Sequence, residues 1–186
     1  AYVLKLDNIS TYETEAGPNG TFNITGVLAG DVTKCKTNLK GKIAPITDPL
    51  KATFDVSGDI GNVDLNFAMK YLAVAGISNC KSLAVRVNIA SQDGVFTKQS
   101  NIALVLNRVA LTGTLGNQLS KVGMSHIPEL SLPFPIGGTS AKPETPGLTD
   151  ILVAVVKGVI KNHAVAAATS AVSDALGGVL GGKKGE

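Results

Sequence analysis

Apolar and polar residues alternate with a period of two through much of the chain as far as Leu106. Segment 51–57 is typical, since Ala52, Phe54 and Val56 point to one side and the residues between them point to the other. This alternation predicts a half-buried β-strand. The same pattern predicts further strands in segments 21–28, 36–43, 63–71, 83–90 and 102–106.

Short turn sequences separate these predicted strands. Segments 17–20, 58–62 and 92–94 contain the glycine, asparagine, aspartate or proline residues that preset a turn or tolerate a positive φ. Connections this short join antiparallel strands, because parallel strands need long crossovers. We therefore expect one large antiparallel sheet with a polar face and an apolar face.

The pattern changes after residue 122. Pro128, Pro133 and Pro135 space an apolar strip, which predicts an extended segment that is neither the interior of a helix nor a central strand. Segment 137–146 is rich in glycine, proline and small polar residues, which is typical of a surface linker. Residues 123–147 are thus expected to form an extended segment and a linker.

One strong helical pattern follows, over residues 148–177. Thr149 can cap this helix, and Asp150 lies in its first turn. Apolar residues recur at helical spacing at Leu152, Val155, Val156, Val159 and Ile160. Beyond Asn162 the polar residues move to another side of the helix, so either the helix kinks near Asn162 or two helices meet there. A glycine pair ends the helix, and residues 178–186 form a tail.

These elements predict a single α+β domain over residues 1–186, with antiparallel strands in residues 1–122. The C-terminal helix would be about 40 Å long. A wide sheet has to cover its apolar face, and this helix is the longest element able to do so. We therefore expect a large curved antiparallel β-sheet wrapped around the long C-terminal α-helix, with Gly26, Gly41 and Gly76 as sites of bending or close approach.

The composition excludes several classes of protein. The 186 residues are 44% hydrophobic, 17% charged and 4% aromatic, which is too apolar for a disordered segment. The net charge of +3 comes from scattered residues, without the basic stripe and stacking aromatics that nucleic acid requires. Charges at Asp150, Lys157, Lys161 and Asp174 interrupt the apolar helix, so we expect no transmembrane span.

Three N-glycosylation sequons begin at Asn8, Asn19 and Asn23, and their clustering predicts a glycosylated surface. The alternative is that asparagine, serine and threonine are simply common in this region. The chain starts at Ala1 rather than at methionine, as a mature protein does after removal of a signal peptide. We therefore expect a secreted, extracellular glycoprotein.

The residues able to carry out chemistry are few. In an oxidising compartment Cys35 and Cys80 would form a disulfide, whereas two unpaired thiols are the alternative in the cytosol. His126 and His163 stand alone, without the neighbours of a metal site. The sequence also lacks a Gly-x-Ser-x-Gly elbow, a His-Glu-x-x-His pair and a phosphate-binding loop. We expect neither an enzyme nor a bound cofactor.

The scarcity of aromatic residues predicts an incompletely filled interior. Aliphatic side chains on both the sheet and the helix fill less volume than aromatic ones, so we expect an apolar cavity between them that binds and carries a lipid or another hydrophobic ligand. Its expected lining is Phe54, Phe67, Met69, Tyr71, Val85, Val87, Leu104 and Leu106 from the sheet and Val155, Val156, Val159 and Ile160 from the helix. The alternative is a tightly packed core made by the same residues.

A second class of function is a structural or surface-active protein without a bound ligand. Such a protein would act through its amphipathic surfaces, or assemble into homo-oligomers through exposed apolar surface. A bound lipid or pigment in the purified protein would distinguish the carrier from this alternative.

The segment Ile127-Pro128-Glu129-Leu130-Ser131-Leu132-Pro133 resembles a run in takeout-type proteins, in which Ile-Pro-Glu-Leu is followed by a second proline. These proteins belong to the tubular lipid-binding superfamily, with the juvenile-hormone-binding proteins and the group-seven mite allergens. A secreted domain of this size, with a curved antiparallel sheet around a long helix, is also similar to that superfamily. The resemblance implies carriage of a lipid, hormone or carotenoid-like ligand.

Overall fold

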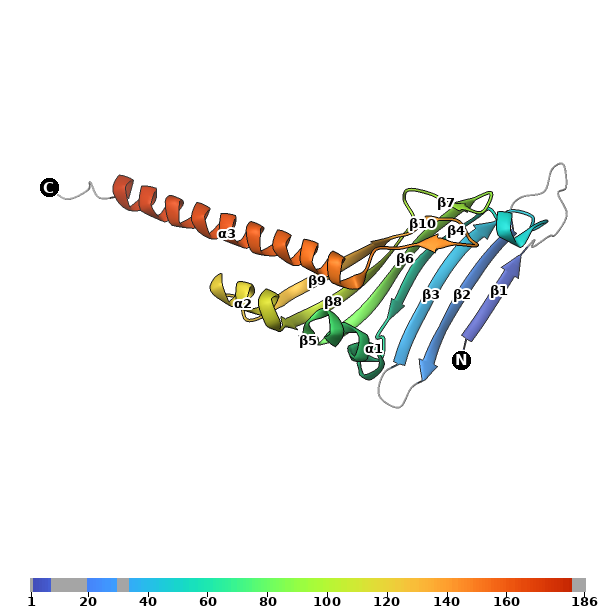
Figure 1. Ribbon diagram of the computed structural model, residues 1–186, viewed down its shortest axis with the longest axis horizontal. Helices are drawn as coiled ribbons and strands as arrows, with labels where there is room; N and C mark the ends of the chain where they lie inside the picture. Colours follow the sequence, from blue (N-terminus) through green and yellow to red (C-terminus); the bar gives the residue numbers. More distant parts are fainter. Residues whose placement is uncertain (1, 8–19, 30–33, 182–186) are drawn as a thin grey trace.

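The computed structural model of the protein describes residues 2–7, 20–29 and 34–181 (Figure 1). Its longer strands are β1 (Tyr2–Asp7), β2 (Gly20–Ala29), β3 (Lys34–Ile43), β4 (Phe54–Gly61), β6 (Ser82–Gln92), β8 (Asn101–Leu111) and β9 (Ile127–Pro135). Its shorter strands are β5 (Ile77–Asn79), β7 (Val95–Phe96), β10 (Gly137–Gly138) and β11 (Pro143–Glu144). Its helices are α1 (Leu65–Leu72), α2 (Gly113–Lys121) and α3 (Leu148–Gly181), with short 3₁₀ turns η1 (Pro49–Lys51) and η2 (Ala73–Ala75).

Within these residues, nine strands form one open antiparallel sheet, and β10 and β11 form a separate small hairpin. The strand order is β1-β2-β3-β4-β6-β8, with β5 and β9 both paired to β8 and β7 paired to the end of β6. The prediction of an α+β fold with one large antiparallel sheet and a C-terminal helix is therefore confirmed. Consecutive long strands pair with one another throughout, β4 with β6 across α1 and β8 with β9 across α2.

The register of the sheet creates the two expected faces. Directly paired residues of antiparallel strands lie on the same face. On one face, a row runs from Leu4 through Ile24 and Leu39 to Gly58 and Val87. We call the face that carries this row the apolar face. On the other, the polar face, the neighbouring row consists of Lys5, Asn23, Lys40, Ser57 and Asn88.

Two of the predicted turns can be compared with the structure. The turn at 92–94 is confirmed, since Asp93 and Gly94 have φ values of 49° and 77° between β6 and β7. The turn at 58–62 is wrong, because β4 continues through Gly61 and only Asn62, with φ 53°, leaves it. Residues 17–19 of the third predicted turn lie outside the described residues.

The predicted strand over 63–71 is also wrong, because this segment contains α1. The side chain of Asp64 caps the helix by accepting a hydrogen bond from the Asn66 N–H at 2.9 Å. Ala68 and Leu72, four residues apart, are buried on the same side of α1. The sequence supports both periods, and the packing of this pair against the core selects the helical one. Helix α2 was not predicted, and it buries Leu119.

The two outer edges of the sheet differ. β9 forms an edge beside β8, and its three prolines agree with the prediction of an extended segment outside the centre of the sheet. Leu130 and Leu132 of β9 are buried in the core, whereas Pro133 is exposed. The other edge, β1, contains no proline.

Helix α3 contacts the rest of the protein near its beginning. Ile151, Leu152 and Val156 are buried against β9 and the neighbouring helices, whereas residues 161–166 are exposed. The helix runs to Gly181, four residues beyond the predicted end at 177, and projects away from the sheet (Figure 1). Residues 182–186 of the predicted tail lie outside the described residues. No helix in the described part of the chain is long and apolar enough to cross a bilayer.

The predicted disulfide is wrong, because Cys35 and Cys80 are both free thiols. Cys35 lies in β3. Cys80 lies two residues before Ser82, where β6 starts. β4 lies between these strands in the sheet. Two strand spacings amount to roughly 10 Å, which exceeds the Cα–Cα distance of about 4.4–6.8 Å that a disulfide allows.

Candidate ligand-binding face

Within the described residues, the apolar face over β1, β2, β3 and β4 has no helix packed on it, since no helix in this part of the chain makes an extended contact with any of these four strands. Leu4 and Leu6 of β1 are 57% and 56% exposed. The other residues of this surface are partly exposed, namely Phe22, Ile24, Leu39, Ile43, Phe54, Val56 and Ile60. They form cross-strand rows, so their side chains contact one another without an element above them.

Beyond β4, the same face continues on β6 and β8 towards the core. Val85 pairs with Ile60 on one side and with Leu104 on the other, and Val87 pairs with Gly58 and Ile102. Next to them Leu106 is fully buried beneath the helices. The apolar face is therefore continuous, and the helices cover only one part of it.

Where α3 meets the sheet, the side chains are closely packed. Leu132, Leu152 and Val156 have no exposed surface, and they belong to one cluster with Leu106. Dense contact of this kind favours the alternative of a packed core at the helix–sheet junction. The surface available to a hydrophobic ligand lies beside this junction, over β1–β4.

The expected cavity-lining residues consequently fall into three groups. Leu106 and Val156 are fully buried in the core, and Met69, Leu104, Val155, Val159 and Ile160 pack against it while partly exposed. Phe54, Val85 and Val87 are partly exposed on the apolar face. Phe67 and Tyr71 are 62% and 61% exposed on the outer side of α1, so the prediction that they line the interior is wrong.

Several residues of the apolar face were missing from the expected set. Leu4 and Leu6 alternate with Lys5 and Asp7, which is the period-two pattern of a half-buried strand. Ile24, Leu39 and Val56 lie in predicted strands. These strands are distant from the C-terminal helix α3, both in sequence and in the sheet. The alternation identifies all of them as residues of the apolar face. Only the position of α3 in the structure shows that no helix covers them.

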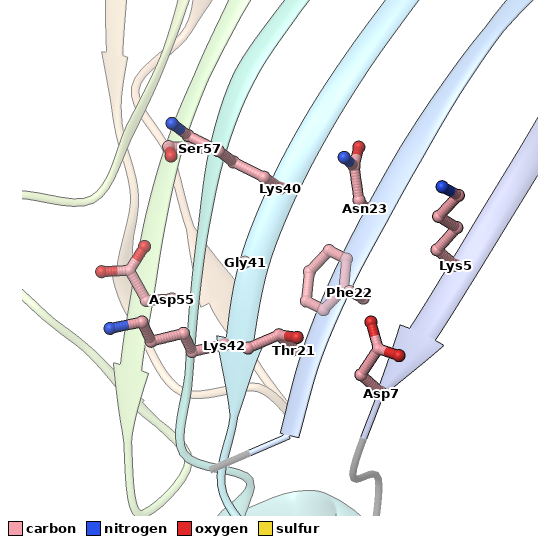
Figure 2. A pocket seen from close by; sticks show the side chains of 10 residues that line it. All are labelled: Lys5, Asp7, Thr21, Phe22, Asn23, Lys40, Gly41, Lys42, Asp55 and Ser57. Atoms are coloured by element: carbon pink, nitrogen blue, oxygen red, sulfur yellow. The ribbon is translucent and has the colours of Figure 1, made fainter. Parts of the chain in front are cut away.

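The polar face carries a separate open pocket of about 550 Å³ (Figure 2). Its lining side chains come from β1 to β4 and are mostly polar: Lys5, Asp7, Thr21, Asn23, Lys40, Lys42, Asp55 and Ser57, with Phe22 and Gly41 between them. Mixed lysine and aspartate side chains do not suit an apolar ligand. Asn23, the described sequon asparagine, is exposed at this pocket.

A smaller pocket of about 340 Å³ brings together Cys80, Arg108 and His126. Arg108 has a φ of 50°, and this left-handed residue interrupts the alternation of β8, so that Leu106 and Val109 are both buried. Burial raises the pKa of the Cys80 thiol. The thiol therefore stays protonated at neutral pH, whereas nucleophilic chemistry requires the thiolate.

No cluster of metal-binding side chains occurs among the described residues. On the polar face, Arg86 forms an ion pair with Asp59, with 3.9 Å between the Arg86 Nε and Asp59 Oδ1 atoms. Both side chains are mostly exposed. Such a pair contributes little to stability in water.

Comparison of the chain with family models, with curated proteins and with solved structures finds no match in any of the three.

Proposed function

We propose that the protein binds and carries a flexible hydrophobic ligand, such as a lipid acyl chain, on the apolar face. The observation that supports this most directly is that rows of aliphatic side chains extend across β1–β4 without a covering helix. Monomeric proteins rarely expose a contiguous apolar surface of this kind unless it binds something.

The side chains of the face favour an aliphatic chain over a rigid aromatic ligand. Leucine, isoleucine and valine predominate among these side chains. An acyl chain can follow the twist of such a surface because its bonds rotate. Burial of roughly ten methylenes would contribute roughly 8 kcal/mol before the cost of ordering the chain.

Binding of a fluorescent fatty acid to the full chain tests this proposal. Leu39→Glu places a charge in the middle of the apolar face, and we expect it to weaken binding at least about tenfold, because the carboxylate must be desolvated. The matched control is Asn38→Glu, which adds the same charge one residue away on the polar face. Circular dichroism would establish that both variants fold.

Equal affinity of the two variants would contradict the proposal. Mass spectrometry of organic extracts from the purified protein supplies a second measurement, and we expect a stoichiometric lipid or pigment. A lipid-free protein that instead lowers surface tension strongly, or forms oligomers that Leu39→Glu dissociates, would support the structural alternative.

We also propose that the protein is a secreted glycoprotein. Asn23 is exposed on the polar face, opposite Lys5 and Lys40, where a glycan would not obstruct the apolar face. Asn8 and Asn19 lie outside the described residues. A mass shift on endoglycosidase treatment that decreases in Asn23→Gln would support modification of this residue. The absence of enzymatic activity and the resemblance to the tubular lipid-binding superfamily also stay predictions.

A sheet that wraps around α3 and a kink near Asn162 stay predictions as well. A kink there would let the following part of α3 turn towards the apolar face and cover a bound ligand. Spin labels at Val165 and Asn38 would measure this movement. A shorter distance between them in the presence of a fatty acid is the expected result, and an unchanged distance would contradict it.

A further inference from the structure

Helix α1 carries apolar side chains on two sides that lie roughly 100° apart around its axis. Its inner side buries Ala68 and Leu72 in the core. Its outer side, continued into η2, exposes Phe67, Tyr71 and Val74, which are 62%, 61% and 87% exposed. We call these three residues the outer stripe.

The outer stripe is built of residues at helical spacing rather than scattered ones. The rings of Phe67 and Tyr71 lie 5.5 Å apart between centroids and are tilted by 58°. This contact orients both rings along the surface of the helix, and Val74 follows one turn later. Aromatic residues with a polar tip are enriched where proteins meet the surface of a membrane.

Basic residues lie on α1 and beside its first residue. Lys70 lies between its two aromatic residues in the sequence and is exposed. Lys34 and Lys81 line a pocket of about 440 Å³ together with Leu65, the first residue of α1. None of these three lysines forms an ion pair with another residue of the described part of the chain. The nearby carboxylate of Asp64 accepts a hydrogen bond from the backbone of α1.

From this combination we infer that α1 docks the protein on a lipid bilayer whose surface is anionic. Phe67, Tyr71 and Val74 enter the interface between headgroups and acyl chains, and Lys34, Lys70 and Lys81 contact the phosphates. The charge of Lys70 on α1, and of Lys34 and Lys81 beside its first residue, complements such a surface, and each exposed lysine near it contributes to binding. The proposal goes beyond ligand carriage, because it assigns a different surface and a different partner.

The position of α1 suits transfer of a ligand between the bilayer and the protein. Figure 1 shows α1 at the end of the sheet where β3 begins and β2 ends. Cys35 and Thr37, the first partly exposed residues of β3 on the apolar face, lie at this same end. An acyl chain that leaves the bilayer beside α1 would therefore reach the apolar face directly.

Flotation of the full chain with vesicles tests the inference. Vesicles of phosphatidylcholine alone are compared with vesicles that also contain phosphatidylglycerol. We expect binding to the anionic vesicles that weakens as salt is added, because salt screens the lysines. The double substitution Phe67→Ser and Tyr71→Ser, and separately Lys70→Glu, should each lower the partition coefficient about tenfold.

The matched control is the exposed apolar and basic pair in η1. Leu50 is 61% exposed and Lys51 is also exposed, but η1 lies at the opposite end of the sheet (Figure 1). Leu50→Ser with Lys51→Glu should leave vesicle binding unchanged. Equal losses in this control and in the α1 variants, or vesicle binding that the α1 variants retain in full, would overturn the inference.

The two proposals fail separately. The α1 variants should still bind the fluorescent fatty acid with unchanged affinity, because the outer stripe is not on the apolar face. Leu39→Glu should still bind anionic vesicles. Loss of vesicle binding in Leu39→Glu, with α1 variants unaffected, would place the bilayer contact on the apolar face and overturn docking through α1.

Discussion

The ring of Phe22 lies against Gly41, its direct partner in the β2–β3 pair. A Cβ atom at residue 41 would come within 2.5 Å of the Phe22 Cζ atom and would also collide with the backbone carbonyl oxygen of Asp55. The glycine thus allows the aromatic ring and the neighbouring strand to approach closely. The expectation of close approach at Gly41 is confirmed, whereas Gly76, with φ 97°, ends η2 instead.

Replacement of this glycine should therefore destabilise the sheet. We expect Gly41→Ala to lower the free energy of unfolding by about 1–3 kcal/mol, because the backbone contact cannot relax as a flexible side chain would. Urea denaturation measures this change. Gly61→Ala in β4 is the matched control, since nothing lies within 4 Å of a Cβ there and its cost should be near zero. Equal costs would contradict the close approach.

Capping of α1 should contribute measurably to stability. Asp64→Ala removes the acceptor for the Asn66 N–H, and we expect the free energy of unfolding to fall by about 1 kcal/mol. Asp64→Ser keeps a capping oxygen and should restore most of the loss. Thermal unfolding of the three proteins would test this, and an Asp64→Ser variant as unstable as Asp64→Ala would contradict the assigned cap.

The beginning of α3 should anchor the helix. Leu152 has no exposed surface, so Leu152→Ala should cost about 2–5 kcal/mol through lost burial and the cavity left behind. Val165→Ala, on a residue that is 58% exposed in the same helix, should cost far less. Denaturant unfolding of both variants distinguishes them. Comparable losses would show that the later part of α3 also packs against the protein.

The two thiols should react at different rates. Cys80 is 4% exposed and burial raises its pKa, so alkylation of the native protein should modify partly exposed Cys35 first. Peptide mapping measures the order of modification, and a Cys35–Cys80 disulfide in that map would contradict the free thiols.

The raised pKa of Cys80 should also make stability depend on alkaline pH. The folded state holds the Cys80 proton to a higher pH than the unfolded state does, so the free energy of unfolding should fall as rising pH ionises the thiol of the unfolded chain.

Sequence alternation predicted the long strands because a half-buried strand must place apolar residues on one face. β2, β3, β6 and β8 all contain their predicted segments, within a few residues at the ends. The strand predicted over 63–71 was wrong because a segment this short can satisfy both a period of two and a helical period. Only contact of Ala68 and Leu72 with the core distinguishes the two, and that contact depends on distant residues.

The sequence by itself determined a two-faced antiparallel sheet, an extended proline-spaced strand and a helix near the C-terminus, because each depends on the local order of residues. Tertiary structure decided where α1, α2 and α3 lie over the sheet. Leu106 and Leu39 have the same alternating pattern in sequence, yet Leu106 is buried beneath the helices and Leu39 is not. Coverage depends on packing between distant segments, so the uncovered apolar face and the exposed rings of Phe67 and Tyr71 emerge only in three dimensions.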